Sequence, residues 1–370
     1  MKLRILICGI LPPPFFGHSA MYKILMESAF VDAFEVTFLD MKFWSYEQHK
    51  KVTLLKVLKL VRYFFQYLYL IVRRRPRYIL YNMSFDKMPF LKDMLFCGAG
   101  KMFGCRIVLH DMGQYVQELY DSSGKFYQGM IHWLLGNVTA SIVLGESVRS
   151  VYQGFIDPKR LFVVPGSVAD TKDLAPTDGP ALSVRKNINV LYFSFMSESK
   201  GVLTAFKVVP QVLAADPRIH FIFAGPVGSG SIQTALNQLR QRYNSRVEHL
   251  GYIGDALERT KMYRNADVFI FPTHRDVFGL VLLHAMAEGL PVIASREGAV
   301  PEIIQDGING FLVEKGNEGQ LAQRILTLAG DPQLRQKIGS ANRERYLNAY
   351  SPQRYGQRMI DTFVEIEKLG

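Results

Sequence analysis

Short, continuous apolar runs recur along the chain, separated by longer segments of mixed polarity. In the first half they occupy residues 3–10, 36–40, 78–82, 106–110, 141–145 and 161–165, and in the second half residues 189–195, 220–225, 247–253, 268–272, 291–295 and 310–314. Runs of this length, rich in β-branched and aromatic residues, are typical of strands buried on both faces of a parallel sheet. The intervening segments are long enough for crossover helices. The pattern predicts an α/β protein with two Rossmann-like, doubly wound domains in series.

The change from one series of runs to the next predicts the domain limits. Residues 167–187, "SVADTKDLAPTDGPALSVRKN", have no apolar periodicity and contain two prolines, which favours a linker. We therefore expect an N-terminal domain over residues 1–168, a linker over 169–187 and a C-terminal domain over 188–350. Ser351-Pro352 is typical of a helix start, so residues 351–370 are expected to form a C-terminal helix that crosses back to the first domain.

Composition describes a soluble globular protein: 48% of the 370 residues are hydrophobic and 21% are charged. The cysteines Cys8, Cys97 and Cys105 are too few and too scattered for a disulfide framework or a zinc site, which favours a reducing, cytoplasmic compartment. We find no Asp-x-Asp motif on a suitable loop and no His/Cys cluster, and therefore expect no metal site. The apolar run at residues 3–11 ends in three prolines and is interpreted as a first strand, not as a signal peptide.

The net charge of +11 is concentrated in one segment. Residues 50–77 contain nine Lys/Arg and no acid, whereas a nucleic-acid-binding protein is expected to be basic over a wider surface. Within residues 52–72, Lys56, Lys59, Arg62 and Gln66 interrupt an apolar stretch at helical spacing. This pattern favours an interfacial amphipathic helix on an anionic membrane surface over a membrane span. The alternative is a crossover helix that shows its basic stripe to water.

The ends of the predicted strands are where ligands are expected, because open parallel sheets bind them at their carboxyl edges. Loops rich in polar residues or glycine follow several strands, at residues 12–18, 110–113, 194–201, 224–230, 272–279 and 295–302. Phe278-Gly279-Leu280 opens a helix directly after a strand. A helix start exposes unpaired N–H groups that can hold a phosphate, and glycine permits close approach. By itself, the same pattern is more typical of tight strand-to-helix packing than of a phosphate site.

Residues 266–313, "ADVFIFPTHRDVFGLVLLHAMAEGLPVIASREGAVPEIIQDGINGFLV", resemble the signature region of family 4 retaining glycosyltransferases of the GT-B fold. The matching positions are Pro272, Phe278-Gly279-Leu280, Ala285-Met286-Ala287, Gly289, Pro291–Ala294, Gly298, Pro301-Glu302, Asp306-Gly307 and Asn309-Gly310. "SESKGVLTAF" is similar to the family's Lys-Gly loop, and "PPPFFGHSAM" to its first glycine loop. The resemblance implies GT-B architecture, with an acceptor-side domain and a nucleotide-sugar-binding domain facing across a cleft.

The resemblance also assigns roles to individual residues. The family has two glutamates eight residues apart, one beside the donor sugar and one on the nucleotide ribose, and this sequence has Asp276 and His284 there. Lys200 matches the lysine that neutralises the donor diphosphate. The position five residues earlier, often Arg or polar in the family, is Phe195. Arg275 could replace that contact, although an exposed loop arginine is usually only solvated. Without the family pattern, His284 would be read as a core histidine and Lys200 as a surface lysine.

The complete set of candidate residues follows from these matches and from the strand ends. As catalytic residues we expect Asp276, Lys200 and His110; as donor- or nucleotide-binding residues Gly17, Gly225, Tyr252, Ile253, Phe278, Gly279, Leu280 and His284; and on the acceptor side His18 and Asp111. The nucleotide sugar, UDP- or GDP-linked, would be a substrate, and no cofactor is expected.

The function implied is a metal-independent, retaining transfer of a sugar to a glycan acceptor. The basic segment favours a lipid-linked acceptor in cell-surface polysaccharide or lipopolysaccharide synthesis, on a protein held at the inner face of the membrane. A catalytically weakened GT-B protein that binds a glycan or supports a partner transferase is the alternative, favoured by His284. A nucleotide-sugar epimerase on the same fold is disfavoured by the signature region.

Overall fold

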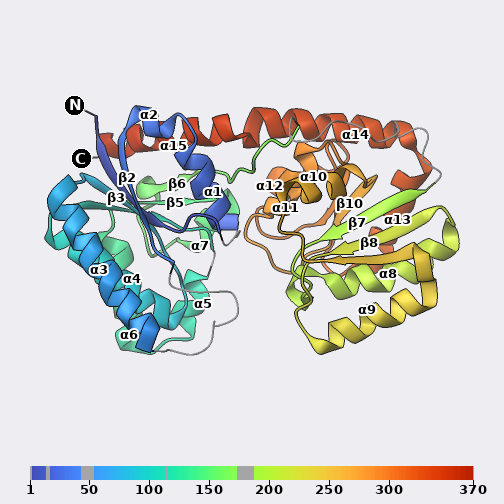
Figure 1. Cartoon of the computed structure of the whole chain (residues 1–370), viewed down its shortest axis with the longest axis horizontal. Helices are drawn as coiled ribbons and strands as arrows, with labels where there is room; N and C mark the ends of the chain where they lie inside the picture. The colour runs from blue at the N-terminus through green and yellow to red at the C-terminus, as the bar shows by residue number, and fades with distance from the viewer. Residues whose placement is uncertain (1, 14–16, 43–53, 114, 173–186, 370) are drawn as a thin grey trace. The chain divides into compact units, whose positions relative to one another are not determined.

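The computed structural model describes residues 2–13, 17–42, 54–113, 115–172 and 187–369. The chain divides into two compact units (Figure 1). Unit 1 comprises Met1–Gly166 together with Pro352–Gly370, and unit 2 comprises Ser167–Ser351. Most of the expected linker, residues 173–186, lies outside the described residues, as do residues 50–53 of the basic segment and 14–16 of the first glycine loop.

Unit 1 contains a parallel sheet of six strands in the order β2-β1-β3-β4-β5-β6. The strands are β1 (Arg4–Gly9), β2 (Glu35–Asp40), β3 (Tyr78–Asn82), β4 (Arg106–His110), β5 (Ala140–Val143) and β6 (Leu161–Val163). Each corresponds to one apolar run of the first half. The inner strands are buried almost throughout, as expected for a sheet covered by helices on both faces.

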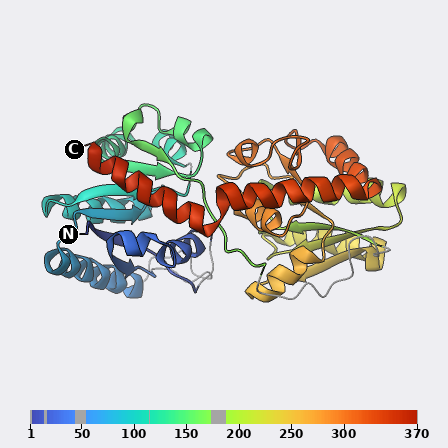
Figure 2. The same cartoon turned by 90° about the horizontal axis from the view of Figure 1, so that it is seen from above.

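The helices of unit 1 form two layers (Figures 1 and 2). They are α1 (Gly17–Met26), α2 (Phe30–Ala33), α3 (Leu54–Arg74), α4 (Lys87–Met102), α5 (Val116–Asp121), α6 (Lys125–Asn137), α7 (Glu146–Val151) and α15 (Pro352–Lys368), with the short 3₁₀ turn η2 (Pro158–Arg160). Helices α1, α2 and α15 pack together on one face of the sheet, and α3, α4 and α6 cover the other.

Unit 2 repeats the arrangement with a parallel sheet in the order β12-β11-β10-β7-β8-β9. Its strands are β7 (Ile188–Phe193), β8 (Ile219–Ala224), β9 (Val247–Gly251), β10 (Val268–Phe271), β11 (Val292–Ser295) and β12 (Phe311–Val313). Its helices are α8 (Val202–Ala215), α9 (Gly230–Tyr243), α10 (Ala256–Arg264), α11 (Leu280–Ala287), α12 (Val300–Ile303), α13 (Glu318–Gly330) and α14 (Pro332–Arg345), with shorter turns η3 (Glu198–Lys200), η4 (Asn244–Arg246) and η5 (Tyr346–Tyr350).

The predicted α/β class with two doubly wound parallel sheets is confirmed, and the differences lie at strand ends. The run 247–253 was expected to be one strand, but β9 ends at Gly251. The φ of Gly251 is 67°, outside the β region, so Tyr252 and Ile253 fall in the following loop. The runs 141–145 and 189–195 also end two residues early, at Val143 and Phe193.

The last helix joins unit 1 through an apolar stripe. Pro352 is its first residue, as the sequence predicts. Its buried residues include Tyr355, Met359, Phe363 and Ile366, which repeat at the three- and four-residue spacing of one helix face. The Phe363 ring contacts those of Phe30, Phe34 and Tyr78. The C-terminal segment is thereby part of the core of unit 1.

Candidate functional site

The loops after β7 and β10 are bonded to each other at the carboxyl edge of the unit 2 sheet. The carbonyl of Ser199 accepts hydrogen bonds from the backbone N–H groups of His274 and Arg275, each at 2.9 Å, and from the Thr273 hydroxyl at 3.1 Å. Gly201 has a φ of 68°, and a Cβ there would lie 1.7 Å from the carbonyl oxygen of Pro272. Only glycine fits at that position, so the Lys-Gly pair is held directly against the 272–276 loop.

This docking brings Lys200 and Asp276 together. The ammonium of Lys200 forms an ion pair with Oδ2 of Asp276 and lies 3.3 Å from the carbonyl oxygen of Arg275. Both side chains are partly buried, at 28% and 14% exposed. An ammonium in this position can neutralise an anionic group bound at the edge of the sheet.

Asp276 also organises the start of α11. Its Oδ1 accepts hydrogen bonds from the N–H groups of Phe278, at 3.1 Å, and Gly279, at 2.8 Å. Gly279 has a φ of 81° and immediately precedes α11. The Asp276 carboxylate therefore bridges the Lys200 ammonium and backbone donors next to the helix start, where a phosphate is expected to bind.

Two supports of this arrangement were not among the candidate site residues, although Gly298 was among the positions that match the family signature. Gly298 has a φ of 53°, and a Cβ there would lie 2.1 Å from the carbonyl oxygen of Asp276. Its place in the Gly-x-x-Pro pattern of residues 298–301 is a signal for this role. Ser199 contributes through its backbone carbonyl, which no side-chain pattern reveals. His274 is held by a 2.9 Å hydrogen bond between its Nε2 and the Thr204 hydroxyl.

His284 lies in the last turn of α11, separate from the Lys200–Asp276 pair along the helix. It is partly buried and its ring stacks on that of Tyr263, with centroids 5.9 Å apart. Burial, with a smaller contribution from the Arg259 charge, lowers the pKa of His284 to about 3. The imidazole is therefore neutral at physiological pH, where it can donate one hydrogen bond and accept one.

Three further candidates, Gly225, Tyr252 and Ile253, follow the carboxyl ends of β8 and β9. Gly225 has a φ of 117° and packs against Ser194, whose carbonyl oxygen would lie 2.0 Å from an added Cβ. Its N–H donates to the carbonyl of Gly251 at 2.7 Å. Tyr252 is exposed and Ile253 is partly buried in the loop after β9. Leu280 is the first residue of α11. A pocket for a base at Tyr252 and Ile253 stays a prediction.

In unit 1, His110 ends β4 as a fully buried histidine. Among the described residues, neither of its ring nitrogens has a hydrogen-bond partner. Its ring makes an edge contact with Tyr22, with centroids 5.5 Å apart. Burial, together with the nearby charge of His18, lowers the pKa of His110 to about 3. Buried polar atoms without a partner are rare in native structures.

The neighbours of His110 are ordered in different ways. The carboxylate of buried Asp111 accepts hydrogen bonds from the hydroxyl of Tyr152 and from the N–H of Gly113, the latter at 2.8 Å. Burial raises the pKa of Asp111 to about 7, although both hydrogen bonds oppose the shift. Gly17 and His18 begin α1 at the same edge of the sheet, and burial lowers the pKa of His18. Tyr152, which sequence reasoning missed, carries no motif that would indicate it.

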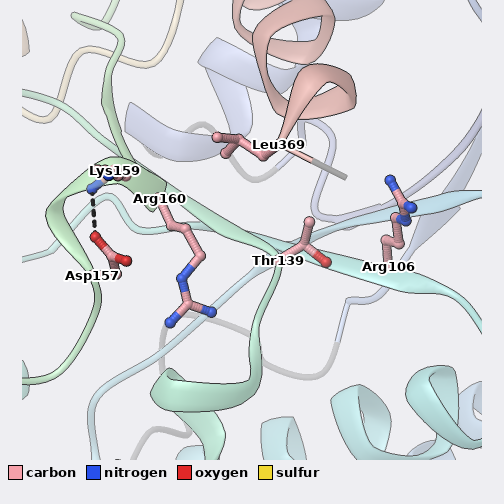
Figure 3. A pocket seen from close by; sticks show the side chains of 6 residues that line it. All are labelled: Arg106, Thr139, Asp157, Lys159, Arg160 and Leu369. Atoms are coloured by element: carbon pink, nitrogen blue, oxygen red, sulfur yellow. Dashed lines mark hydrogen bonds between the residues drawn. The ribbon is translucent and has the colours of Figure 1, made fainter.

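A hollow of about 370 Å³ lies elsewhere in unit 1, lined by Arg106, Thr139, Asp157, Lys159, Arg160 and Leu369 (Figure 3). Arg106 begins β4 and Arg160 precedes β6, so the hollow is at the amino edge of the sheet, opposite His110. The Arg160 guanidinium donates to the carbonyls of Gly136 and Val138, at 3.2 and 2.8 Å. These contacts give Arg160 a structural role. None of the predicted site residues lines the hollow.

The described residues contain no group of three or more His, Cys, Asp or Glu side chains positioned to hold a metal ion. Nor do they include a helix with the combination of length and apolarity that a membrane crossing requires.

Residues 187–331 match the family model "Glycosyl transferases group 1". Over these residues the chain is similar to the group 1 glycosyltransferases. The match covers β7 to α13 and therefore includes the Lys200–Asp276 pair, the start of α11 and His284.

Curated relatives match part of the length of this chain. The chain is 27% identical over 206 residues to the phosphatidylinositol N-acetylglucosaminyltransferase gpi3 subunit of Schizosaccharomyces pombe, covering 55% of this chain and 43% of that protein. It is 28% identical over 167 residues to the capsular polysaccharide biosynthesis glycosyltransferase CapM of Staphylococcus aureus, covering 45% and 43%. The chain thus matches less than half the length of each of these relatives.

Solved structures resemble the whole chain. HepE of Anabaena in complex with UDP-glucose superposes with a TM-score of 0.72 at 19% identity, over 98% of this chain and 99% of that one. At this level of identity the likeness establishes the GT-B fold, and the individual site residues stay predictions.

Proposed function

We propose that this protein transfers a sugar from a UDP- or GDP-linked donor to a glycan acceptor, without a metal and with retention at the anomeric carbon. The observation that carries the proposal is the convergence of the Lys200 ammonium, the Asp276 carboxylate and the backbone donors at the start of α11. A UDP-glucose complex of the similarly folded HepE supports a nucleotide-sugar donor.

In the proposed reaction, the bond between the anomeric carbon and the diphosphate oxygen breaks while the acceptor hydroxyl oxygen bonds to the same face of that carbon. The acceptor proton passes to the departing diphosphate. Negative charge develops on that leaving group, and Lys200 with the N–H groups near Gly279 would stabilise it. In other enzymes, removal of one such donor raises the activation barrier by roughly 3–4 kcal/mol. Asp276 would then turn from Lys200 toward the donor sugar.

The acceptor-side roles fall on unit 1. His110 is neutral at physiological pH, and neither of its ring nitrogens is bonded to another described residue, so it can accept one hydroxyl hydrogen bond and donate another. Asp111 and Tyr152 hold the loop that follows. We assign His110 to contact with sugar hydroxyls and Asp111 to the acceptor side.

We further propose that the acceptor is lipid-linked, in cell-surface polysaccharide or lipopolysaccharide synthesis, and that the basic segment 50–77 holds the protein at the inner face of an anionic membrane. The relative from Schizosaccharomyces pombe is named for phosphatidylinositol and that from Staphylococcus aureus for capsular polysaccharide. Helix α3 covers most of the basic segment.

His284 is the observation that favours a second candidate. A carboxylate can accept from both ribose hydroxyls, whereas a neutral imidazole stacked on Tyr263 can accept from only one. A GT-B module that binds a glycan or supports a partner transferase, with weak turnover of its own, would tolerate that loss.

The test is a thermal-shift screen of UDP, GDP and their sugar conjugates, followed by a transfer assay with the nucleotide that binds. A ligand at 100 times its Kd stabilises the native state by about 2.7 kcal/mol, which gives a clear rise in melting temperature. The proposal expects a shift with UDP or GDP, a smaller one with the bare nucleoside, and sugar transfer. A shift without transfer to any glycan acceptor supports the second candidate. The absence of a shift with all nucleotides contradicts both the donor class and the assigned site.

A further inference from the structure

Helix α3 has three distinct sides. Tyr67 and Ile71 are its buried residues, and the Tyr67 hydroxyl donates to the carbonyl of Phe96 in α4 at 2.8 Å. At 3.6 residues per turn, the exposed Lys59, Arg62 and Arg73 lie on a second side. The third side is apolar and exposed, and consists of Leu54, Leu58, Val61, Phe65, Tyr69 and Val72. A crossover helix that only covers a sheet buries its apolar side, whereas among the described residues α3 has a complete apolar stripe exposed.

Similar stripes run along the two neighbouring helices of the same layer. On α4 the exposed apolar residues are Met88, Leu91, Leu95 and Met102, and on α6 they are Phe126 and Trp133. The spacings of three, four and seven residues place each set on one helix side. Helices α4 and α6 lie side by side, because Tyr127 bonds to the carbonyl of Lys87 and Lys101 donates to the carbonyl of Asn137 at 2.7 Å. We call α3, α4 and α6 with these stripes the apolar layer (Figure 1).

All charged side chains of the apolar layer except one are positive. The three helices contain nine Lys/Arg, which are Lys56, Lys59, Arg62, Arg73, Arg74, Lys87, Lys92, Lys101 and Lys125. Their single acid, Asp93, is fully buried and paired with Lys92. Apolar stripes flanked by lysine and aromatic residues match the interface of an anionic bilayer, where hydrocarbon and headgroups lie within a few ångströms. Protein interfaces, in contrast, are depleted in lysine.

We propose that the whole apolar layer, and not only the basic segment of α3, docks on an anionic lipid bilayer with its stripes inserted between the headgroups. The partner is a lipid surface containing phosphatidylglycerol or a similar anionic lipid. The inference deepens the proposed function, since a docked layer would keep unit 1 at the membrane that carries a lipid-linked acceptor. It predicts two separable contributions to binding, one electrostatic and screened by salt, the other apolar and unaffected by it.

Two valines provide a matched comparison. Val61 on α3 and Val364 on α15 are each 46% exposed, and they lie on opposite faces of the unit 1 sheet. In vesicle flotation with the full chain, Val61→Glu should reduce binding to phosphatidylcholine–phosphatidylglycerol vesicles about tenfold, because a carboxylate cannot enter the apolar interface. Val364→Glu should leave binding unchanged. Leu95→Glu on α4 tests the part of the layer beyond α3 and should act like Val61→Glu.

Tryptophan fluorescence supplies an independent measurement. The chain has two tryptophans, and Trp44→Phe leaves Trp133 of α6 as the sole reporter. Addition of vesicles should shift its emission to the blue, and brominated lipid should quench it. At about 1 M salt, where charges are screened beyond about 3 Å, binding should weaken but not disappear. Binding that vanishes in salt and does not respond to Leu95→Glu would reduce the contact to α3 electrostatics and overturn the layer.

Other occupants would give different results. If the layer joins two copies of this chain, light scattering will show a dimer without lipid, which Val61→Glu converts to monomer, and flotation will be absent. No effect of Val61→Glu or Leu95→Glu on flotation also contradicts the proposal. The vesicle assay contains no nucleotide sugar, so its outcome is independent of turnover. Sugar transfer without flotation would contradict the membrane-docking proposal alone. Flotation without sugar transfer would contradict only the proposed transfer reaction.

Discussion

Lys200 and Asp276, which are 76 residues apart in sequence, form an ion pair at the carboxyl edge of the unit 2 sheet. The carboxylate of Asp276 has a second function, because its other oxygen accepts two backbone hydrogen bonds at the start of α11. One side chain thus contacts both kinds of donor that are proposed to hold a phosphate. A nucleoside diphosphate bound as proposed would compete with Asp276 for Lys200.

We first expect Lys200→Ala to lower turnover by on the order of a hundredfold, because the leaving diphosphate would lose its cationic contact. The melting temperature should change little, since the lysine is partly exposed and its ion pair is small in energy. Lys207→Ala is the matched control: Lys207 lies on α8 and pairs with Glu318 on the surface, 2.9 Å away. Steady-state kinetics on both variants decide the matter, and equal turnover in the two would remove Lys200 from the reaction.

The competition between Asp276 and phosphate leads to a second prediction. Asp276→Asn keeps an oxygen for the N–H groups of Phe278 and Gly279 but removes the charge facing Lys200. Binding of the nucleoside diphosphate should tighten on the order of fivefold, as loss of a competing pair worth about 1 kcal/mol implies. Binding of the bare nucleoside should not change. Calorimetry with both ligands is the measurement, and weaker diphosphate binding by the Asn variant would show that Asp276 contacts the donor even without a sugar.

The fold was predictable because each strand of a doubly wound sheet is a local apolar run, as in Tyr78–Asn82 or Val268–Phe271. The family resemblance assigned Lys200 to the donor diphosphate and Asp276 to the donor sugar, but it did not predict their ion pair, because nothing in the local sequence links the two loops. The contact of Asp111 with Tyr152 and the stack of His284 on Tyr263 were not predictable, since both depend on side chains that tertiary packing brings together. Periodicity identified α3 as amphipathic but could not say which of its sides faces the sheet.

A third prediction concerns acid stability. Burial lowers the pKa of His110 from 6.5 to about 3, so the unfolded chain binds a proton at pH values where the native state does not. Above pH 6.5 His110 is neutral in both states, so its burial carries no titration penalty. As the pH falls from 6.5 toward 3, protonation of the unfolded chain lowers the free energy of unfolding. His110→Phe replaces the titrating ring with an apolar ring of similar size. Its melting temperature should therefore decline less steeply than that of the wild type between about pH 6.5 and 4, by a few °C in total. If the melting temperatures of the two proteins change with pH in parallel, His110 is solvated in the native state.

The adjacent residue should behave in the opposite way. Burial raises the pKa of Asp111 from 3.8 to about 7, so the unfolded chain loses this proton before the native state does. Below pH 3.8 Asp111 is protonated in both states, so its burial carries no titration penalty. As the pH rises from 3.8 through about 7, ionisation of the unfolded chain lowers the free energy of unfolding. Asp111→Asn retains an acceptor for Gly113 and has no proton to lose. Relative to the wild type, the variant should gain a few °C at about pH 8 compared with pH 5. If the variant's melting temperature exceeds that of the wild type by the same amount at both pH values, the stabilisation comes from packing and not from the titration of Asp111.

His284→Glu is the last prediction, and it tests the departure from the family at the ribose position. The neutral imidazole can accept one hydrogen bond from a ribose, whereas a carboxylate can accept from both hydroxyls. A hydrogen bond to a charged acceptor contributes about 1.5–3 kcal/mol, so the Glu variant should bind the nucleoside diphosphate roughly tenfold to a hundredfold more tightly. The substitution also removes the stack on Tyr263, and thermal melting of the free variant measures that cost. His284→Gln serves as the control, because it offers an acceptor without the charge and should give little gain. If titration calorimetry shows weaker binding for the Glu variant while its fold is intact, His284 is fitted to a different ligand geometry. If neither protein binds a nucleotide, the glycan-binding or transferase-partner role becomes the better account of this chain.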